Sequence, residues 1–350
     1  MQIKKMKGMI TLKIKRILFT KKNTAELVEE ECPKTGDNDV LVKTAYSTIS
    51  CGTEKANITA SLTEDLDLQE GEEPHFPRSG GYSSSGIVAD KGKNVKSIEI
   101  GDRVAVFASA HKSFNVMNEN NVIKLSEKNT LQEAAASYIS TFSMAAIRKT
   151  RLEIGESALV MGLGTLGLFS VAFARAAGAV PVIAVDPVKE RREKALKFGA
   201  DYAFDPFEKD FTKKVKELTD GGVNVAVEVT GVGAGLEECL ECMARMGRIA
   251  LLGCTRNKNF TIDYYNRIHC PGITVIGAHT CARPTFDSHP GCFTHRDDIK
   301  SYLNLCANGR INFADMIEEV HSPKECDKVY TRLVNESNFP NIVQFDWSKI

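Results

Sequence analysis

The stretch SCGTEKAN, Ser50 to Asn57, places a single cysteine in front of a Gly-Thr-Glu turn. The thiolate form of cysteine is a good zinc ligand, so Cys51 is a candidate for a catalytic metal site. A catalytic zinc ordinarily has three protein ligands and one open position. The segment therefore raises the question of whether side chains elsewhere in the chain complete such a site.

A second chemical signal is the segment ALVMGLGTLGLFSVAFARAAG, in which Gly162, Gly164 and Gly167 have the GxGxxG spacing. The motif follows a buried strand pattern and precedes a helical one, which is the context of a dinucleotide-binding turn. The first glycine permits a tight turn, the second lets the backbone approach a pyrophosphate, and the third lets helix and strand pack closely. Thr165 and Leu166 begin the helix, whose unpaired N–H groups attract phosphate.

Asp186 stands at the end of the next predicted strand, where a carboxylate accepts hydrogen bonds from both ribose hydroxyls and repels a 2′-phosphate. The position of this carboxylate favours NAD over NADP. Together with the strand and helix patterns that flank the glycine-rich turn, it argues against the alternative that the turn serves packing alone. Arg191 either covers the adenine or is a solvated charge on a helix. Because of this cation, NADP stays an alternative cofactor. Thr230, Gly231 and Gly253 follow two further strands whose carboxyl ends point at the same crevice.

The residues after Thr130 form the framework that positions this turn. LQEAAASYISTFSMAAIRKT has helical spacing, and buried runs then alternate with helical tracts. Six strands joined by crossovers predict a doubly wound parallel sheet. The predicted strands are Ala158 to Met161, Val182 to Val185, Tyr202 to Phe204, Val225 to Val229, Ile249 to Leu252 and Ile273 to Ile276.

The residues before Val122 are short alternating runs separated by Gly, Pro, Asn and Asp, which predicts a β-rich, barrel-like unit. Its first strand is expected over Ile10 to Leu18. Near the other end of the chain, THRDDIKSYLNLCANGR predicts a helix with Thr294 as its N-cap and Gly309 at its close.

Composition narrows the range of partners. The chain has 350 residues, with 45 Lys and Arg against 45 Asp and Glu, so no net field favours nucleic acid or an acidic membrane. No run approaches the roughly 18 apolar residues of a membrane span, and ten scattered cysteines suit the reducing cytoplasm. We expect two domains, a cytoplasmic location, and a small molecule or a second copy as partner.

These features together resemble the medium-chain dehydrogenase/reductase superfamily of zinc alcohol and polyol dehydrogenases. The resemblance covers nearly the whole chain, and it implies a GroES-like catalytic domain over residues 1–130 and 311–350 and a Rossmann dinucleotide-binding domain over residues 131–310. Its carriers are Cys51-Gly52-Thr53-Glu54, Gly101-Asp102-Arg103-Val104, the turn from Gly162 to Gly167, and Asp186.

In that superfamily the catalytic zinc is held by the cysteine of the CGTE-like turn, by the histidine and often the glutamate of a GHE motif, and sometimes by a later glutamate. Here GGYSSSGIV matches at Gly81, but Tyr82 and Ser83 replace the histidine and the glutamate. The four-cysteine structural zinc lobe is missing too. Bound zinc would need His75 or His111 to move in, so we expect no catalytic zinc.

Two cysteines with CxxC spacing, Cys239 and Cys242, lie on a predicted helix without a second pair, and a structural role is expected for them.

Without zinc, a hydrogen-bonding group must polarise the substrate oxygen. Thr53 matches the proton-relay hydroxyl of the superfamily, and Tyr82 stands at the former ligand position, so a Tyr82–Thr53 pair is the hypothesis for acid–base duty. The alternative is that Tyr82 only packs. The candidate catalytic residues are Cys51, Thr53, Glu54 and Tyr82.

The segment GAHTCARPTFDSHPGCFTHRDD follows the sixth strand, and His279 at its start should lie beside the nicotinamide. Its cations either receive a carboxylate or phosphate, or pair with neighbouring carboxylates. The segment and the ending FPNIVQFDW also resemble a subgroup with an incomplete zinc site that includes bacteriochlorophyllide dehydrogenase-like members. The cations are Arg283, His289, His295 and Arg296, and the carboxylates are Asp287, Asp297 and Asp298.

The sequence therefore predicts an NAD(H)-dependent oxidoreductase that interconverts a secondary alcohol, a polyol or sugar derivative, and its ketone. The alternatives are a zinc-free NAD(P)H-dependent quinone or enoyl reductase and a nucleotide-binding protein without catalysis. Members of the superfamily usually pair through the last strand of the cofactor sheet, so the resemblance implies a homodimer or homotetramer.

Overall fold

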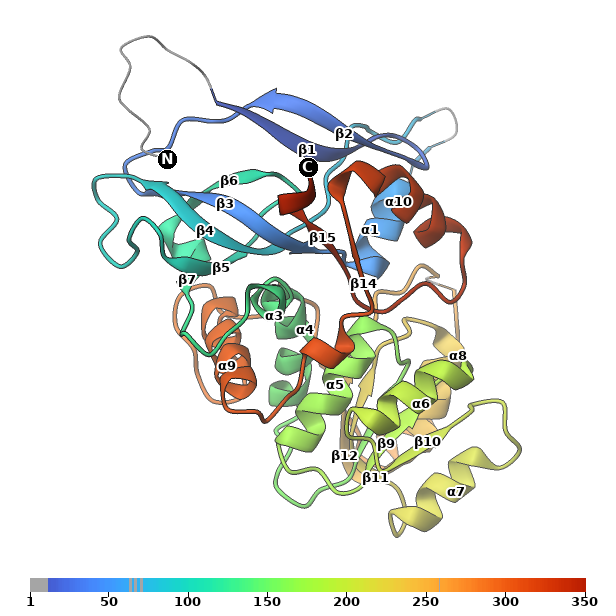
Figure 1. Ribbon diagram of the computed structural model, residues 1–350. Coiled ribbons are helices and arrows are strands. Elements are labelled where there is room, and N and C mark those ends of the chain that lie inside the picture. The colour runs from blue at the N-terminus through green and yellow to red at the C-terminus, as the bar shows by residue number, and fades with distance from the viewer. Residues whose placement is uncertain (1–11, 63–64, 66–67, 70–71, 258) are drawn as a thin grey trace.

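The computed structural model describes residues 12–62, 65, 68–69, 72–257 and 259–350. It has two lobes, a β-rich lobe that contains the first and the last of the described residues and a lobe built around a parallel sheet (Figure 1). No helix in these described ranges is long and apolar enough to cross a bilayer.

The β-rich lobe contains a seven-stranded sheet in the order β14-β15-β3-β4-β5-β7, with β6 paired to β3, and a separate hairpin of β1 and β2. Valines that alternate along β3 and β5 form its interior, as the period-two pattern predicts. The strands are β1 (Lys13–Lys21), β2 (Thr24–Glu31), β3 (Asp39–Thr48), β4 (Ser83–Lys91), β5 (Arg103–Phe107), β6 (Phe114–Asn118), β7 (Val122–Lys124), β14 (Glu319–His321) and β15 (Val343–Asp346).

Two features of this lobe bear on the predictions. The first strand begins at Lys13, later than expected, and Ile10 and Thr11 lie outside the described residues. The C-terminal strand β15 pairs antiparallel with β3, so the end of the chain returns to the first lobe. The domain divisions near residues 130 and 310 stay predictions.

The second lobe is a six-stranded parallel sheet in the order β10-β9-β8-β11-β12-β13. This confirms the predicted fold class, a Rossmann sheet beside a GroES-like β-rich domain. β8, β9 and β10 have the predicted bounds, whereas β11 and β12 begin earlier and β13 one residue later. The strands are β8 (Ala158–Met161), β9 (Val182–Val185), β10 (Tyr202–Phe204), β11 (Val223–Glu228), β12 (Met243–Leu251) and β13 (Thr274–Gly277).

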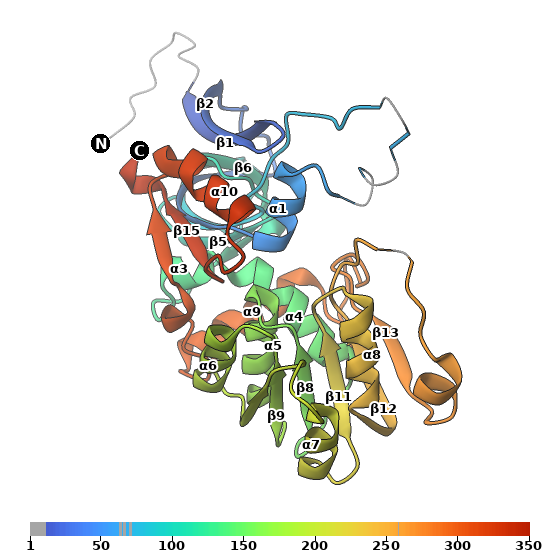
Figure 2. The same cartoon turned by 90° about the vertical axis from the view of Figure 1, so that its right-hand side faces the viewer.

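Helices cover both faces of this sheet (Figures 1 and 2). The predicted N-cap of α9 is confirmed, since the side chain of Thr294 accepts a hydrogen bond from the Asp297 N–H. The helices are α1 (Cys51–Ile58), α3 (Leu131–Ala134), α4 (Ser137–Lys149), α5 (Thr165–Ala176), α6 (Lys189–Lys197), α7 (Phe211–Leu218), α8 (Gly233–Glu241), α9 (His295–Ala307) and α10 (Cys326–Asn335), with short turns η1 (Glu119–Asn121), η2 (Tyr265–His269), η3 (Ala314–Met316), η4 (Pro323–Glu325) and η5 (Trp347–Lys349).

The helical tract after Thr130 is broken into α3 and α4, which the periodicity did not predict. The carbonyl of Ala135 accepts hydrogen bonds from the hydroxyls of Thr48 (2.9 Å) and Ser83 (2.7 Å). The Ser83 hydroxyl in turn accepts from the N–H of Tyr138 at 3.2 Å. The sheet therefore satisfies backbone groups that a continuous helix would pair internally.

Candidate functional site

A cavity of about 560 Å³ lies between the two lobes, and the glycine-rich turn and the SCGTEKAN segment both line it. A cavity of about 620 Å³ on the outer side of α4, α5 and α9 contains none of the predicted site residues. The interlobe cavity is therefore the candidate site. Its lining includes Ser50, Cys51, Thr53, Lys55, Tyr82, Ile139, Phe142, Gly162, Gly164, Thr165, Leu166, Asp186, Arg191, Thr230, Glu336, Ser337, Phe339, Pro340 and Asn341.

The glycine turn has the geometry that its spacing predicts. Gly162 has φ of +95°, a region that glycine occupies without strain. A Cβ on Gly167 would lie 1.9 Å from the Gly162 carbonyl oxygen, so α5 can pack this closely only on glycine. A Cβ on Gly164 would meet nothing within 4 Å, because this backbone faces open space at the N-terminus of α5. A dinucleotide phosphate fits that open position.

Asp186 and Arg191 line the same cavity. The Asp186 carboxylate is 3% exposed and accepts hydrogen bonds from the N–H groups of Leu163 and Val188, each at 2.8 Å. Nη1 of Arg191 lies 3.8 Å from Asp186, and its buried Nε has no partner among the described groups. These residues fit an adenosine ribose, with an orphaned donor beside it.

The remaining predicted cofactor residues divide into two groups. Thr230 lines the cavity, and its N–H donates to the Glu228 carboxylate at 2.7 Å. Gly167, Gly253 and His279 do not line it. Gly253 serves packing, because a Cβ there would lie 2.3 Å from the Gly231 nitrogen, and His279 is exposed after β13.

The thiol of Cys51 is directed toward the C-terminal segment. Its Sγ lies 3.7 Å from the carbonyl oxygen of Pro340 and 3.6 Å from that of Asn341. Burial raises the pKa of this thiol to about 12, so Cys51 is protonated near neutral pH. In this arrangement the thiol donates to backbone carbonyls of the C-terminal segment.

Tyr82, Thr53 and Ser50 form a cluster of hydroxyl groups in the cavity. The Tyr82 hydroxyl donates to Oγ of Ser50 and lies 3.4 Å from Oγ1 of Thr53. Burial raises the pKa of Tyr82 well above its usual range, although the two hydroxyls partly offset this, so Tyr82 remains a neutral phenol. The predicted Tyr82–Thr53 pair is thus brought together, but Ser50 is the closer partner. The sequence prediction missed Ser50, and its position directly before Cys51 was the available signal.

Glu54 lies behind this cluster rather than in the cavity. It is 1% exposed, and its carboxylate accepts from the N–H groups of Ser50 (3.1 Å) and Gly81 (3.0 Å). The other oxygen accepts from Nε2 of His111 at 3.1 Å and from the hydroxyl of Tyr330. Burial opposes ionisation, but these partners lower the pKa of Glu54 overall. The prediction that Glu54 is catalytic is therefore not matched by contact with the cavity.

The two histidines considered as substitute ligands are not poised for zinc. His111 is fully buried, and its second ring nitrogen is paired with the Ser47 hydroxyl at 2.7 Å. His75 is exposed on the segment before Arg78. Within the described ranges, no group of three or more His, Cys, Asp or Glu side chains could hold a metal ion. Cys239 and Cys242 are buried in the core of the parallel sheet. The described residues therefore do not fit a three-ligand zinc site.

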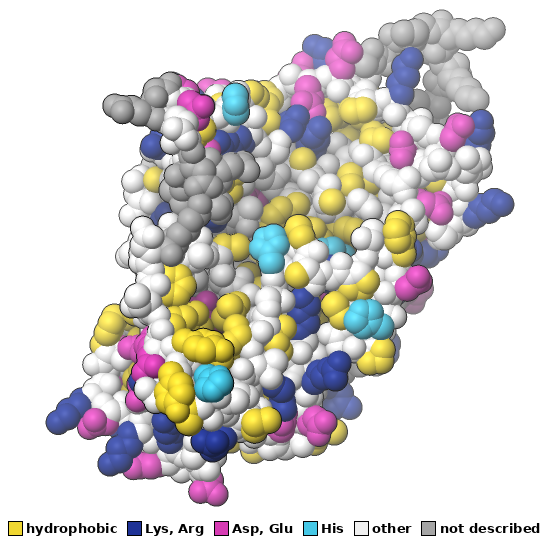
Figure 3. Space-filling view, turned by 180° about the vertical axis from the view of Figure 1, so that it is seen from behind, with side chains coloured by type: hydrophobic (Ala, Val, Ile, Leu, Met, Phe, Trp, Pro, Cys, Tyr) yellow, Lys and Arg dark blue, Asp and Glu magenta, His cyan; other side chains and the backbone are white. Residues whose placement is uncertain are grey.

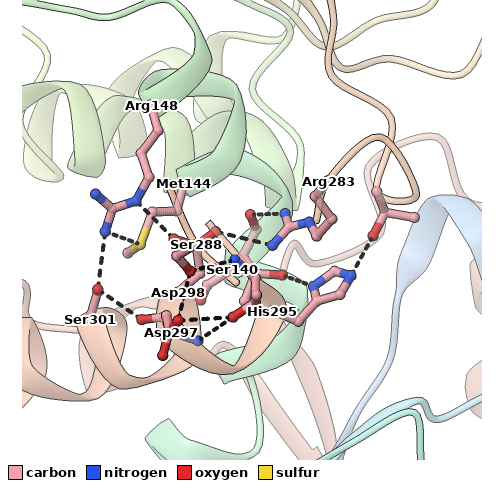
Figure 4. Close-up of polar contacts among 12 residues, drawn as sticks. Ser140, Met144, Arg148, Arg283, Ser288, His295, Asp297, Asp298 and Ser301 are labelled. Carbon is pink, nitrogen blue, oxygen red and sulfur yellow. Dashed lines mark hydrogen bonds and ion pairs between the residues drawn. The ribbon is translucent and has the colours of Figure 1, made fainter. Parts of the chain in front are cut away.

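Of the predicted cations after β13, Arg283, His295 and Arg296 contact groups within the protein, whereas His289 is exposed. Arg283 pairs with Asp298 at 3.1 Å, and Arg296 donates to the backbone carbonyls of Asn120 and Val122. His295 contacts the hydroxyls of Thr141 and Thr280 (Figure 4). Of the two alternatives for this segment, internal pairing is the one observed for Arg283. Asp297 instead pairs with Lys300.

Comparison with known proteins gives consistent matches. Family models for an alcohol dehydrogenase GroES-like domain and for a zinc-binding dehydrogenase match residues 36–141 and 165–289. L-threonine 3-dehydrogenase of Pyrococcus horikoshii is 33% identical over 293 residues, covering 72% of this chain and 79% of the relative. D-guloside 3-dehydrogenase of Escherichia coli is 24% identical over 343 residues, covering 92% and 97%.

Among solved structures, 2R,3R-butanediol dehydrogenase from Bacillus subtilis superposes with a TM-score of 0.80 at 21% identity. The match covers 95% of this chain and 99% of that chain. At this identity the likeness shows the shared two-lobed fold.

Proposed function

Because the chain belongs to the zinc-type medium-chain dehydrogenase/reductase superfamily and is an alcohol dehydrogenase-like oxidoreductase, we propose that it interconverts a secondary alcohol and its ketone with NAD(H) and without catalytic zinc. The substrate is a polyol or a sugar derivative. The observation that carries this proposal is the Tyr82 hydroxyl, which lies in the cavity beside Thr53 while the Cys51 thiol donates to backbone carbonyls.

The relatives support the reaction class. They are named as dehydrogenases of threonine, a guloside and butanediol, compounds that each carry a secondary hydroxyl group. The assignment to the subgroup with an incomplete zinc site stays a prediction.

The cofactor supplies or accepts a hydride at the carbon that bears the substrate oxygen. The turn from Gly162 to Leu166 would hold its pyrophosphate, and Asp186 would accept from the ribose hydroxyls, which supports NAD(H) over NADP(H). Arg191 works against this preference, because its orphaned Nε could donate to a 2′-phosphate. The preference is measured as kcat/KM with NADH divided by kcat/KM with NADPH, and we expect this ratio to exceed one.

Tyr82 exchanges the proton with the substrate oxygen. In ketone reduction its O–H bond breaks and the proton forms the new O–H bond of the alcohol, while the tyrosinate accepts hydrogen bonds from Ser50 and Thr53. A raised pKa keeps Tyr82 protonated at neutral pH, which is the state that this direction requires. Alcohol oxidation is the reverse of this step and starts from the tyrosinate, which the raised pKa disfavours at neutral pH.

The test is turnover of protein that has been stripped with a strong chelator and analysed for metal. We expect far less than one zinc per chain and unchanged oxidation of a secondary alcohol, followed as NADH formation. One zinc per chain together with loss of turnover on stripping would contradict the zinc-free mechanism. Tight NADH binding without turnover of any alcohol or ketone would instead favour a nucleotide-binding protein, and activity with quinones or enones alone would favour the reductase alternative.

The assembly and location remain part of the proposal. β13 is the edge of the parallel sheet, and Val275 on it is 41% exposed, so pairing of two such edges would extend the sheet across a two-fold axis. Each of the ten cysteines lies in the described part of the chain as a free thiol, which supports a reducing compartment such as the cytoplasm.

A further inference from the structure

The cavity of about 620 Å³ outside the interlobe site has the size and the lining of a binding pocket. We call it the helix cavity, because the second half of α4, the end of α5 and the second half of α9 line it. Three of its lining side chains are apolar and at most 5% exposed, namely Met144, Ile147 and Phe173. Pockets for small organic ligands have volumes of roughly 300–1,000 Å³ and mostly apolar linings. The helix cavity therefore has room for the apolar part of a ligand.

The charged side chains that line the helix cavity are both cations. They are Arg148 near the end of α4 and Arg310 just after α9. No Asp or Glu is found among the described residues of this lining. Arg310 is exposed, and its guanidinium has no ion pair or hydrogen bond with another described side chain. The charge of the lining therefore favours an anion.

The guanidinium of Arg148 is held in place by its neighbours (Figure 4). Its Nε donates to the Asp298 carboxylate at 2.8 Å, and its Nη2 donates to Oγ of Ser301 at 3.0 Å. The group also lies 3.9 Å from the centre of the Phe293 ring. Nη1 has no hydrogen bond within the described part of the chain and points away from Asp298, while the side chain stays 27% exposed. A guanidinium that is already fixed loses little conformational freedom when its remaining N–H groups bind an anion.

The carboxylate that pairs with Arg148 does not fully neutralise it, because a second arginine shares it. Asp298 is completely buried, and its other oxygen lies 3.1 Å from Nη1 of Arg283. Figure 4 shows both arginines directed at this one carboxylate. Two guanidinium groups against one carboxylate leave a single positive charge at the edge of the helix cavity. A head group with one negative charge at Nη1 of Arg148 would balance it in a charge-assisted hydrogen bond.

We propose that the helix cavity is a binding site for an amphiphilic monocarboxylate, a hydrocarbon chain with one carboxylate head. The head accepts from Nη1 of Arg148, and the chain covers Met144, Ile147 and Phe173. Arg310 lies at the rim and attracts the same head group. The helix cavity and the interlobe cavity share no lining residue, so this site is separate from the proposed active site and does not depend on it.

The test is calorimetric titration of sodium decanoate, below the concentration at which it forms micelles, into the full chain. We expect one saturable site per chain. Decanol has the same chain without the charge, and acetate has the charge without the chain, so each should bind at least about tenfold more weakly than decanoate. Saturation with NADH should leave the affinity for decanoate within about twofold, because the cofactor belongs to the other cavity.

Four variants locate the site. Ala176→Trp fills the helix cavity from an exposed position on α5 and should abolish binding of decanoate. Arg148→Lys keeps a cation beside Asp298 and removes Nη1, so it should weaken binding at least about tenfold. Arg310→Gln should weaken it about two- to fivefold, because the charge that it removes is exposed. Arg245→Gln replaces an exposed arginine outside both cavities and is the matched control, with the affinity of the wild type expected.

Three results would overturn the site: no saturable binding to the wild type, wild-type affinity in Ala176→Trp, or displacement of decanoate by NADH. Decanol that binds as tightly as decanoate would also overturn it, since the arginines would then contribute nothing. Unchanged NADH binding and melting temperature show that each variant is folded, and if Arg148→Lys fails this check, Ala176→Trp and Arg310→Gln decide. Loss of the proposed dehydrogenase function would leave this result untouched, because the site is judged by binding alone.

Discussion

At the scale of single residues, the site depends on three hydroxyl groups. Tyr82 stands where the superfamily has a histidine ligand, and its hydroxyl has the neighbours that a proton donor needs, Ser50 and Thr53. Glu54 holds the backbone of Ser50 and Gly81 from behind, and so sets the spacing between Tyr82 and its partner. Glu54 is in these terms a positioning residue.

Replacement of Tyr82 by phenylalanine should lower kcat for ketone reduction by about 10²- to 10⁴-fold, because the general acid is lost while the ring remains. KM should change little. Stopped-flow or steady-state measurement of NADH oxidation checks this, with Tyr264→Phe as a control, since Tyr264 is exposed and does not line the cavity. Unchanged turnover of the Tyr82 variant would assign this side chain to packing.

Replacement of Glu54 by glutamine should lower the free energy of unfolding by about 3 kcal/mol at neutral pH, because an amide cannot accept all the hydrogen bonds of this buried carboxylate. The pKa of Glu54 is lowered in the folded chain, so its stabilisation is present above the unfolded pKa of about 4.3 and is lost as pH falls through the folded pKa. The difference in melting temperature from wild type should therefore shrink in acid.

Thermal melts of wild type and Glu54→Gln at several pH values measure this difference. The control is Glu29→Gln, which removes an exposed carboxylate paired with Lys13 and should leave the melting temperature unchanged. A gap between wild type and Glu54→Gln that stays constant down to the acid limit would show that the charge of Glu54 is not the stabilising feature.

At the scale of elements, the break between α3 and α4 is what aims α4 at the site. Thr48 and Ser83 bind the Ala135 carbonyl, and α4 then begins at Ser137 with Tyr138 turned toward Tyr82. Ser83 replaces the glutamate of the superfamily's metal motif, so a position associated with metal chemistry here anchors a helix.

Replacement of Ser83 by alanine should lower the free energy of unfolding by about 1–3 kcal/mol, because the buried N–H of Tyr138 loses its partner. The matched control is Ser84→Ala on the same strand, which removes only a hydroxyl pair with Ser109 and should cost less. Urea unfolding followed by tryptophan fluorescence compares the two variants. An equal effect from both would remove the anchoring role of Ser83.

At the scale of the whole molecule, the face that carries β13 is the candidate for contact with a second copy. Figure 3 shows hydrophobic side chains exposed among charged ones on the lobe of the parallel sheet. On this lobe Val275, Met246 and Tyr265 are all exposed. An exposed strand edge beside apolar side chains is the kind of surface that symmetric dimers bury.

Replacement of Val275 by lysine should convert a dimer into monomers, because it places a charge at the centre of the proposed two-fold contact. Sedimentation velocity measures the mass, and NADH binding reports that the parallel sheet is intact. Thr59→Lys, on the other lobe, is the control. A variant that keeps the mass of the wild type would exclude this edge as the interface.

The parallel sheet and its nucleotide turn were readable from sequence, because buried runs, helical spacing and GxGxxG are local patterns whose causes lie within a few residues. β8, β9 and β10 have the predicted bounds for this reason. Loss of the histidine and glutamate at Tyr82 and Ser83 was also visible in the sequence.

Other features depended on contacts between distant parts of the chain. The contact of Tyr82 with Ser50 is one of these features. Glu54 is another, because Gly81, His111 and Tyr330 bind its carboxylate away from the cavity. The ring contacts of Tyr138 with Phe107 and His295 likewise join β5, α4 and α9. By itself the sequence determined which groups could take part in the chemistry, whereas the tertiary structure decided which of them meet, since burial and hydrogen bonding between lobes have no local pattern.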